Sequence, residues 1–185
     1  MKLIDLFEEE LPNNFDGIVE IIERDCKPFL ESGAKRLLFR GMRNKTKTML
    51  KVNVRQDRKP KSMGVEMHNL ADKWFDEKFG FKARSAAVFV TGDSSEAHDY
   101  GSLYAIFPIG DFKFVWSKKS SDLFVHLFDL ASTIQKLEEL NFKSTDLNDA
   151  IASGNEIMIH CKEYYAVSVD REQAEEYYKA LFERD

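Results

Sequence analysis

The chain lacks the features that mark membrane proteins and disulfide-rich secreted proteins. Its 185 residues include two cysteines, Cys26 and Cys161, which form neither a disulfide framework nor a metal-ligand spacing. No apolar run approaches the ~20 residues that cross a bilayer, and the N-terminal residues are acidic where a signal peptide would be basic. We therefore expect no membrane partner, a cytoplasmic location, and two cysteines that serve as small buried hydrophobes.

Short nucleotide-binding and metal-binding motifs are also missing. The sequence has no GxGxxG and no GxxxxGK[ST], so neither a Rossmann fingerprint nor a P-loop is present. The histidines show no HxxxH spacing and no mixed Cys/His cluster, and we expect no metal site. With 43% hydrophobic and 12% aromatic residues the chain is not disordered, and its length predicts one domain over residues 1–185.

What the chain does have is a strongly uneven charge. Residues 35–61 hold eleven Lys and Arg residues against the single acid Asp57, in a chain whose net charge is −5. Arginine recurs in this segment at Arg40, Arg43, Arg55 and Arg58, and guanidinium groups bind phosphate with two parallel hydrogen bonds. The segment predicts a dinucleotide or a nucleic acid as the partner class.

Hydrophobic periodicity predicts short strands interspersed with helices. Helices are expected over 14–31 with an interruption at Pro28, over 62–80 with Ser62 as cap, as a single turn within 93–100, and over 123–137, 145–152 and 170–182. Strands are expected over 35–42, 49–54, 86–91, 102–108 and 111–116, and as a β-hairpin formed by 155–161 and 164–169. The connections are too short for parallel crossovers, so the predicted class is α+β with mainly antiparallel sheets. Residues 1–34 form an N-terminal helical segment and residues 169–185 a C-terminal helix.

Three blocks resemble the ADP-ribosyltransferase superfamily in the order that the family uses. The strand LLFRG ends in Arg-Gly, like the family's first core strand. The block ARSAAVFVTGDSSEAHDYGSLYAIFPIGDF is similar to the middle block, with a hydroxyl residue at a strand end, an Ala-x-x-aromatic helix and a Pro-x-Gly turn. The segment NEIMIHCKEYYAVS resembles the closing hairpin, which a glutamate opens. Together the blocks cover residues 35–168.

This resemblance implies an ADP-ribosyltransferase-like fold, in which two small sheets flanked by helices form a cleft that binds NAD. It implies a glycosyltransferase of the Arg-Ser-Glu type that moves ADP-ribose from NAD to a protein or nucleic-acid acceptor. The likeness is to small phage or bacterial members, and a phage-encoded protein would act in the host cytoplasm.

The resemblance also assigns roles to individual residues. Glu156 takes the catalytic position, where a carboxylate stabilises the cationic sugar of the transition state. Arg40 is expected to hold the pyrophosphate of NAD, and Gly41 to let the ligand lie against the backbone. The hydroxyl position stays open between Thr91, which ends a strand, and Ser85, which precedes it.

Two tyrosines and one departure complete the assignment. Tyr100 and Tyr104 are candidates for stacking on nicotinamide. Arginine-modifying members carry an acidic residue two positions before the catalytic glutamate, whereas this chain has Gly154 there. Modification of arginine is therefore not expected. A nucleic-acid-binding module built on residues 35–61, or an interaction protein that keeps the fold alone, are the alternatives.

Overall fold

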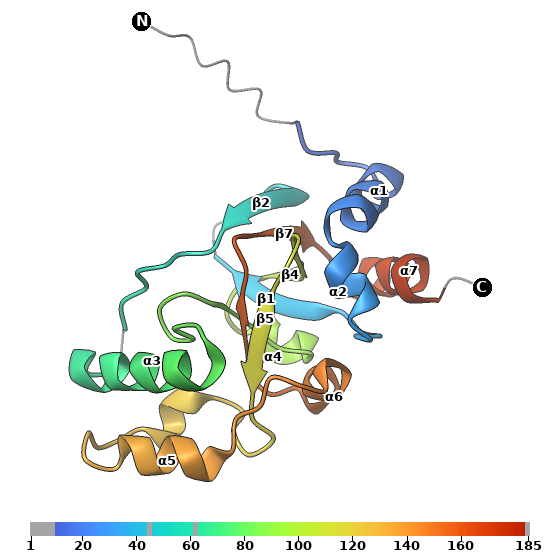
Figure 1. Ribbon diagram of the computed structural model, residues 1–185. Helices are drawn as coiled ribbons and strands as arrows, with labels where there is room; N and C mark the ends of the chain where they lie inside the picture. Colours follow the sequence, from blue (N-terminus) through green and yellow to red (C-terminus); the bar gives the residue numbers. More distant parts are fainter. Residues whose placement is uncertain (1–9, 44–45, 61–62, 184–185) are drawn as a thin grey trace, which may run out of the picture.

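Seven β-strands form two small antiparallel sheets in the computed structural model, which describes residues 10–43, 46–60 and 63–183 (Figure 1). The larger sheet has the order β1-β4-β7-β2 and the smaller sheet the order β3-β6-β5. The strand bounds are β1 (Leu38–Met42), β2 (Met49–Asn53), β3 (Val88–Val90), β4 (Ser102–Pro108), β5 (Lys113–Trp116), β6 (Ile157–His160) and β7 (Glu163–Ser168). All pairings between these strands are antiparallel, so the predicted α+β class is confirmed.

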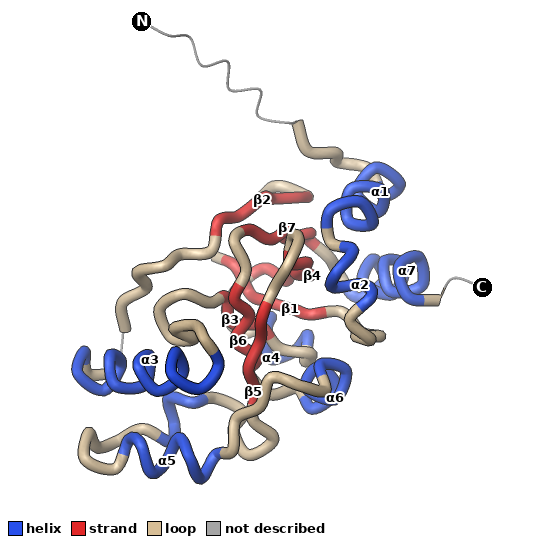
Figure 2. The backbone as a smooth tube through the Cα atoms, in the orientation of Figure 1, coloured by secondary structure: helices blue, strands red, loops and turns tan. Residues whose placement is uncertain are grey.

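Helices surround both sheets, as Figure 2 shows. Their bounds are α1 (Phe15–Asp25), α2 (Lys27–Glu31), α3 (Val65–Phe79), α4 (Ser94–His98), α5 (Thr133–Leu140), α6 (Leu147–Ser153) and α7 (Arg171–Phe182), with one 3-10 turn, η1 (Leu123–His126). Within the described residues, no helix is both long enough and apolar enough to cross a bilayer.

The two sheets meet along the edges of β1 and β3. The backbone N–H of Phe39 donates to the carbonyl oxygen of Thr91 at 2.7 Å, and the N–H of Thr91 donates back to Phe39 at 3.0 Å. Arg40 and Gly41 follow Phe39 directly. Gly41 lets α4 lie close to β1, because a Cβ at this position would collide with the backbone carbonyl oxygen of Ala97 in α4.

The predicted hairpin of 155–161 with 164–169 is wrong. Strand β6 pairs with β3 and β5, whereas β7 pairs with β4 and β2 in the other sheet. The chain changes sheets at Cys161 and Lys162, where the carbonyl oxygen of Lys162 accepts a hydrogen bond from the N–H of Val54 at 3.0 Å. Two apolar strands joined by a short link give the same local pattern whether they pair with each other or with different neighbours.

Helices α1, α2 and α7 pack together against the larger sheet (Figure 1). The ring of Phe29 in α2 contacts Phe107 of β4 and Phe182 of α7, with centroid distances of 6.2 and 6.4 Å. The predicted interruption is present but lies at Cys26, between α1 and α2. Pro28 lies in the first turn of α2, where its missing N–H costs no hydrogen bond.

Helices α3 and α5 form a second hydrophobic cluster against the smaller sheet. The indole N–H of Trp74 in α3 donates to Glu138 of α5 at 2.8 Å. As predicted, α3 ends at Gly80, which adopts the left-handed conformation with φ 75°. Ser62, the expected cap, lies outside the described residues.

The predicted helix over 123–137 is also wrong. Only η1 and the later α5 are helical, and Leu127 between them is extended with φ −107° and ψ 93°. The periodic pattern contained side chains that the fold leaves in solvent, with Phe128 82% exposed. Hydrophobic periodicity counts buried and exposed apolar residues alike, so it predicted a continuous helix here.

Candidate functional site

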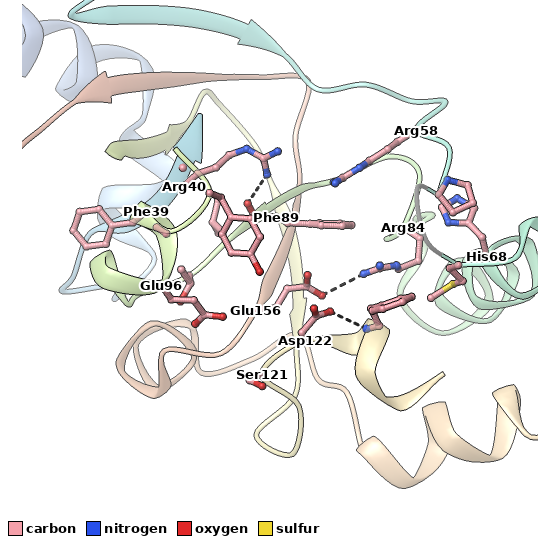
Figure 3. Close-up of a pocket in the computed structure, with 18 of the residues that line it drawn as sticks. Phe39, Arg40, Arg58, His68, Arg84, Phe89, Glu96, Ser121, Asp122 and Glu156 are labelled. Carbon is pink, nitrogen blue, oxygen red and sulfur yellow. Dashed lines mark hydrogen bonds and ion pairs between the residues drawn. The ribbon is translucent and has the colours of Figure 1, made fainter. Parts of the chain in front are cut away.

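A cavity of about 370 Å³ lies at the junction of β1 and β3, and its volume is typical of a small-molecule site (Figure 3). Five of the predicted site residues line this cavity: Arg40, Gly41, Thr91, Tyr100 and Glu156. They come from segments that lie far apart in the sequence. A wider depression of about 820 Å³ lies between β1, α6 and α7, and none of the predicted site residues line it.

Glu156 directly precedes β6 and points into the cavity (Figure 3). Its backbone N–H donates to the carbonyl oxygen of Ser121 at 3.0 Å, and its Oε1 lies 3.2 Å from Nη1 of Arg84. Burial raises the pKa of Glu156 above its ordinary value of 4.5, while the charge of Arg84 acts in the opposite direction. The ion pair with Arg84 therefore holds the Glu156 carboxylate in place and offsets part of its negative charge.

Thr91 and Ser85 occupy different environments. The hydroxyl of Thr91 donates to the carbonyl oxygen of Gly154, two residues before Glu156, and accepts from the N–H of Asp93 at 3.0 Å. It thus ties the end of β3 to the turn that leads into β6. Ser85 is buried outside the cavity lining, where its backbone N–H donates to Asp72 at 3.2 Å. Of the two candidates, Thr91 is the one that lines the cavity and contacts the segment carrying Glu156.

The two tyrosines are also separated. Tyr100 follows α4 at the cavity and is 60% exposed. Tyr104 lies in the centre of β4 with 1% exposure, and its hydroxyl donates to the carbonyl oxygen of Lys47 at 3.0 Å. Only Tyr100 is free to contact a ligand in the cavity.

Arg40 leaves β1 toward the cavity, and its Nη1 donates to the carbonyl oxygen of Phe89 in β3 at 2.6 Å. This bond fixes the guanidinium across the seam, by which we mean the junction of β1 and β3 where the two sheets meet. Arg40 is half-buried, so its remaining donors are available to an anion in the cavity. A phosphate group is the ligand that such a fork fits best.

Two further arginines, Arg58 and Arg84, line the cavity, and neither is among the predicted site residues. The guanidinium carbon of Arg58 lies 4.0 Å from the ring centroid of Phe89, and that of Arg84 lies 4.6 Å from it. Figure 3 shows the ring between the two guanidinium groups. Burial and the neighbouring charges of Arg40 and Arg84 lower the pKa of Arg58 to about 10. Recurring arginine within 35–61 signalled Arg58, whereas nothing in the sequence signalled Arg84.

A buried His-Asp pair supports Arg84. The Oδ1 of Asp72 accepts from the backbone N–H of Arg84 at 2.7 Å, and its Oδ2 lies 3.5 Å from Nε2 of His68. Burial lowers the pKa of His68, Asp72 opposes that effect, and the charges of Arg84 and Arg58 add to it. His68 also lines the cavity. The pair therefore fixes the backbone that carries Arg84.

Acidic side chains lie on the opposite side of the cavity from Arg40 and Arg58 (Figure 3). Glu96 comes from α4 and Asp122 from the residue that caps η1. Burial first, and then nearby carboxylates that include Asp122, raise the pKa of Glu96. The cavity is thus polarised, with Arg40 and Arg58 on one side and Glu96 and Asp122 on the other, while Arg84 pairs with Glu156.

Comparisons of this chain with protein-family models, with curated proteins and with solved structures found no match.

Proposed function

We propose that this chain is an NAD-dependent mono-ADP-ribosyltransferase with an ADP-ribosyltransferase-like fold. The observation that carries the proposal is the convergence of Arg40, Thr91 and Glu156 on one cavity. These residues are the Arg, hydroxyl and Glu positions of the three resembling blocks, and they come from β1, the end of β3 and the start of β6. NAD is the substrate, and the acceptor is a protein or a nucleic acid.

The charges of the cavity suit both the cationic sugar of the transition state and the anionic pyrophosphate of NAD. Cleavage of the bond between nicotinamide and ribose develops positive charge on the sugar, which a fixed carboxylate such as Glu156 stabilises. Arg40 binds the negatively charged pyrophosphate, and the missing side chain of Gly41 makes room for α4 beside it. Tyr100 lines the cavity with an exposed ring that can stack on a planar group.

The direct test is incubation of the purified chain with NAD labelled in its adenylate moiety and a cell lysate. Release of nicotinamide together with labelled macromolecules supports the proposal. Absence of both nicotinamide release and NAD binding contradicts it.

Arg40→Ala should weaken NAD binding by about 1.5–3 kcal/mol, the usual worth of a hydrogen bond to a charged group. Arg40→Lys should recover only part of the loss, because lysine lacks the planar fork. Isothermal titration calorimetry with NAD measures both variants. Arg36→Ala is the matched control, since Arg36 is an exposed arginine outside this cavity. Unchanged NAD affinity in both Arg40 variants would refute this role.

The acid limb of the activity profile should follow the ionisation of Glu156. Because burial raises the pKa of Glu156, the ionised, active form is gained as pH rises through that raised value and lost as pH falls through it. Arg84 opposes this shift, so Arg84→Gln should move the limb to higher pH. Nicotinamide release measured across pH checks this. A limb that stays in place in Arg84→Gln would mean that another group titrates.

A further inference from the structure

The proposed transferase mechanism gives Arg58 no role and gives Arg84 only an influence on the ionisation of Glu156. Arg84 is nine-tenths buried, and its Nε has no hydrogen-bond partner within the described part of the chain. Arg58 is half-buried, and within the same residues no carboxylate lies in ion-pair contact with its guanidinium. Burying a cation without a matching anion is unfavourable, and such a group marks a site where a ligand supplies the missing charge. Arg84 pairs with Glu156 and keeps one unsatisfied donor, so Arg58 is the cation whose matching negative charge is missing.

The positive charge of Arg84 also opposes the electrostatic stabilisation that Glu156 has to provide. Its Nη1 lies 3.2 Å from the carboxylate, so in the absence of a ligand the ion pair offsets the negative charge that would stabilise a cationic sugar. An anion bound to Arg84 accepts hydrogen bonds from its guanidinium. Arg84 then offsets less of the negative charge of the Glu156 carboxylate. The anion would then lie beside the reacting carbon of the ribose, where the acceptor must enter.

The turn before Glu156 gives a second argument for an anionic acceptor. Gly154 caps α6 in the left-handed conformation with φ 72°, so a side chain at this position would be strained. The turn before Glu156 therefore offers no side-chain base at residue 154. A nucleophile that is already negatively charged needs no such base.

The spacing of the two arginines favours a polymer with repeated phosphates over a single phosphate group. The ring of Phe89 separates the guanidinium groups of Arg58 and Arg84 (Figure 3), so the two occupy successive positions along the cavity. Tyr100 and Phe124, 60% and 40% exposed, provide aromatic surface at the same cavity, which suits unpaired bases. The basic segment of residues 35–61 includes Arg58.

We propose that the acceptor is the terminal phosphate of a single-stranded nucleic acid, bound by Arg84 beside Glu156 while Arg58 binds the next phosphate. This inference rests on the proposed transferase activity. A lone pair of the terminal phosphate oxygen forms a bond to C1′ of the nicotinamide ribose. The bond from C1′ to the pyridinium nitrogen breaks, and its electron pair leaves with neutral nicotinamide. The product is a phosphodiester, and no oxidant, reductant or proton transfer is required.

The experiment uses the full chain, labelled NAD and short single-stranded oligonucleotides that carry a phosphate at the 5′ end, at the 3′ end, or at neither end. A phosphoserine peptide is the competing acceptor. We expect label on an end-phosphorylated oligonucleotide and none on the oligonucleotide with two hydroxyl ends. Binding of the same oligonucleotides, measured by fluorescence anisotropy without NAD, should show the same preference for a terminal phosphate.

Arg58→Gln should raise the KM for the phosphorylated oligonucleotide about 10- to 100-fold, as expected for loss of a hydrogen bond to a charged group. Arg58→Lys should recover part of that loss. Arg55→Gln is the matched control, because Arg55 lies in the same segment, is exposed, and pairs with Asp57 at 3.7 Å outside the cavity. Arg84→Gln should abolish the preference for a terminal phosphate in the binding assay. Circular dichroism checks the fold of this buried variant.

Three results would overturn the inference while leaving NAD cleavage intact. They are equal labelling of the oligonucleotide with hydroxyl ends, labelling of the phosphopeptide alone, and release of nicotinamide with no labelled oligonucleotide. If no probe yields nicotinamide and NAD does not bind, the proposed function itself fails and the acceptor inference falls with it.

Discussion

Glu156→Gln should lower the rate of nicotinamide release and ADP-ribose transfer by at least about 10²- to 10³-fold, the usual cost of removing one stabilising group from a charged transition state. The amide keeps an oxygen that can accept from Arg84, so the cavity should keep its shape. NAD affinity should change little, because the lost charge acts on the transition state more than on the bound substrate. Steady-state kinetics and NAD titration measure the two effects separately.

Glu163→Gln is the matched control for this variant. Glu163 is a glutamate at the start of β7, where it pairs with Lys51 at 3.6 Å and does not line the cavity. Its replacement should leave turnover unchanged. Near-normal turnover in Glu156→Gln would remove Glu156 from the reaction and with it the basis of the proposed mechanism.

Thr91→Val should lower kcat by about 10²-fold, the loss expected when a reacting group is misplaced by about 1 Å. Valine keeps the volume of threonine but cannot donate to the carbonyl oxygen of Gly154, and it leaves the N–H of Asp93 without its acceptor. The segment that carries Glu156 then loses its tie to β3. Thr91→Ser keeps the hydroxyl and should retain most of the activity.

Two measurements separate a positioning role of Thr91 from a structural one. Leaving the partners of a buried hydroxyl unpaired should cost about 1–3 kcal/mol of unfolding free energy, which chemical denaturation measures. A positioning role predicts in addition a fall in kcat with little change in KM for NAD. Equal kinetics in Thr91→Val and Thr91→Ser would show that the hydroxyl does not position Glu156.

Local sequence signals predicted the individual elements better than their partners. The caps of α3, α4, α6 and α7 follow from glycine and aspartate at expected positions, and Asp170 with Gln173 forms a capping box at α7. The hairpin prediction placed both strands correctly but was wrong about which strands pair with each other. Cys161 and Lys162 lead β7 into the other sheet, and no property of these two residues signals that change.

The site could be predicted only where a residue lies at the end of an expected strand. Thr91 follows β3 and Glu156 precedes β6, whereas Arg40, expected at a strand end, lies in the middle of β1, which continues to Met42. Arg84 lies in a turn after α3, and Asp72 on that helix fixes its backbone from twelve residues away in the sequence. Contacts of this kind depend on the packed helix, so the sequence alone gives no reason to single out Arg84.

The seam between the sheets is held by few backbone hydrogen bonds. Among the described residues, Phe39 and Thr91 form the one backbone bridge between β1 and β3, with two hydrogen bonds, and the side chain of Arg40 adds a bond to the carbonyl oxygen of Phe89. The ladder between β1 and β4 runs over five residue pairs.

One hydrophobic cluster contains side chains of both sheets, among them Leu38 of β1 and Val90 of β3, so the two sheets share a core beside the seam. Because the seam has fewer backbone hydrogen bonds than the ladders, we expect its amide hydrogens to exchange before those between β1 and β4. Under the proposed function, NAD bound to both Arg40 and Glu156 would link the two sheets across this seam, so added NAD should slow that exchange.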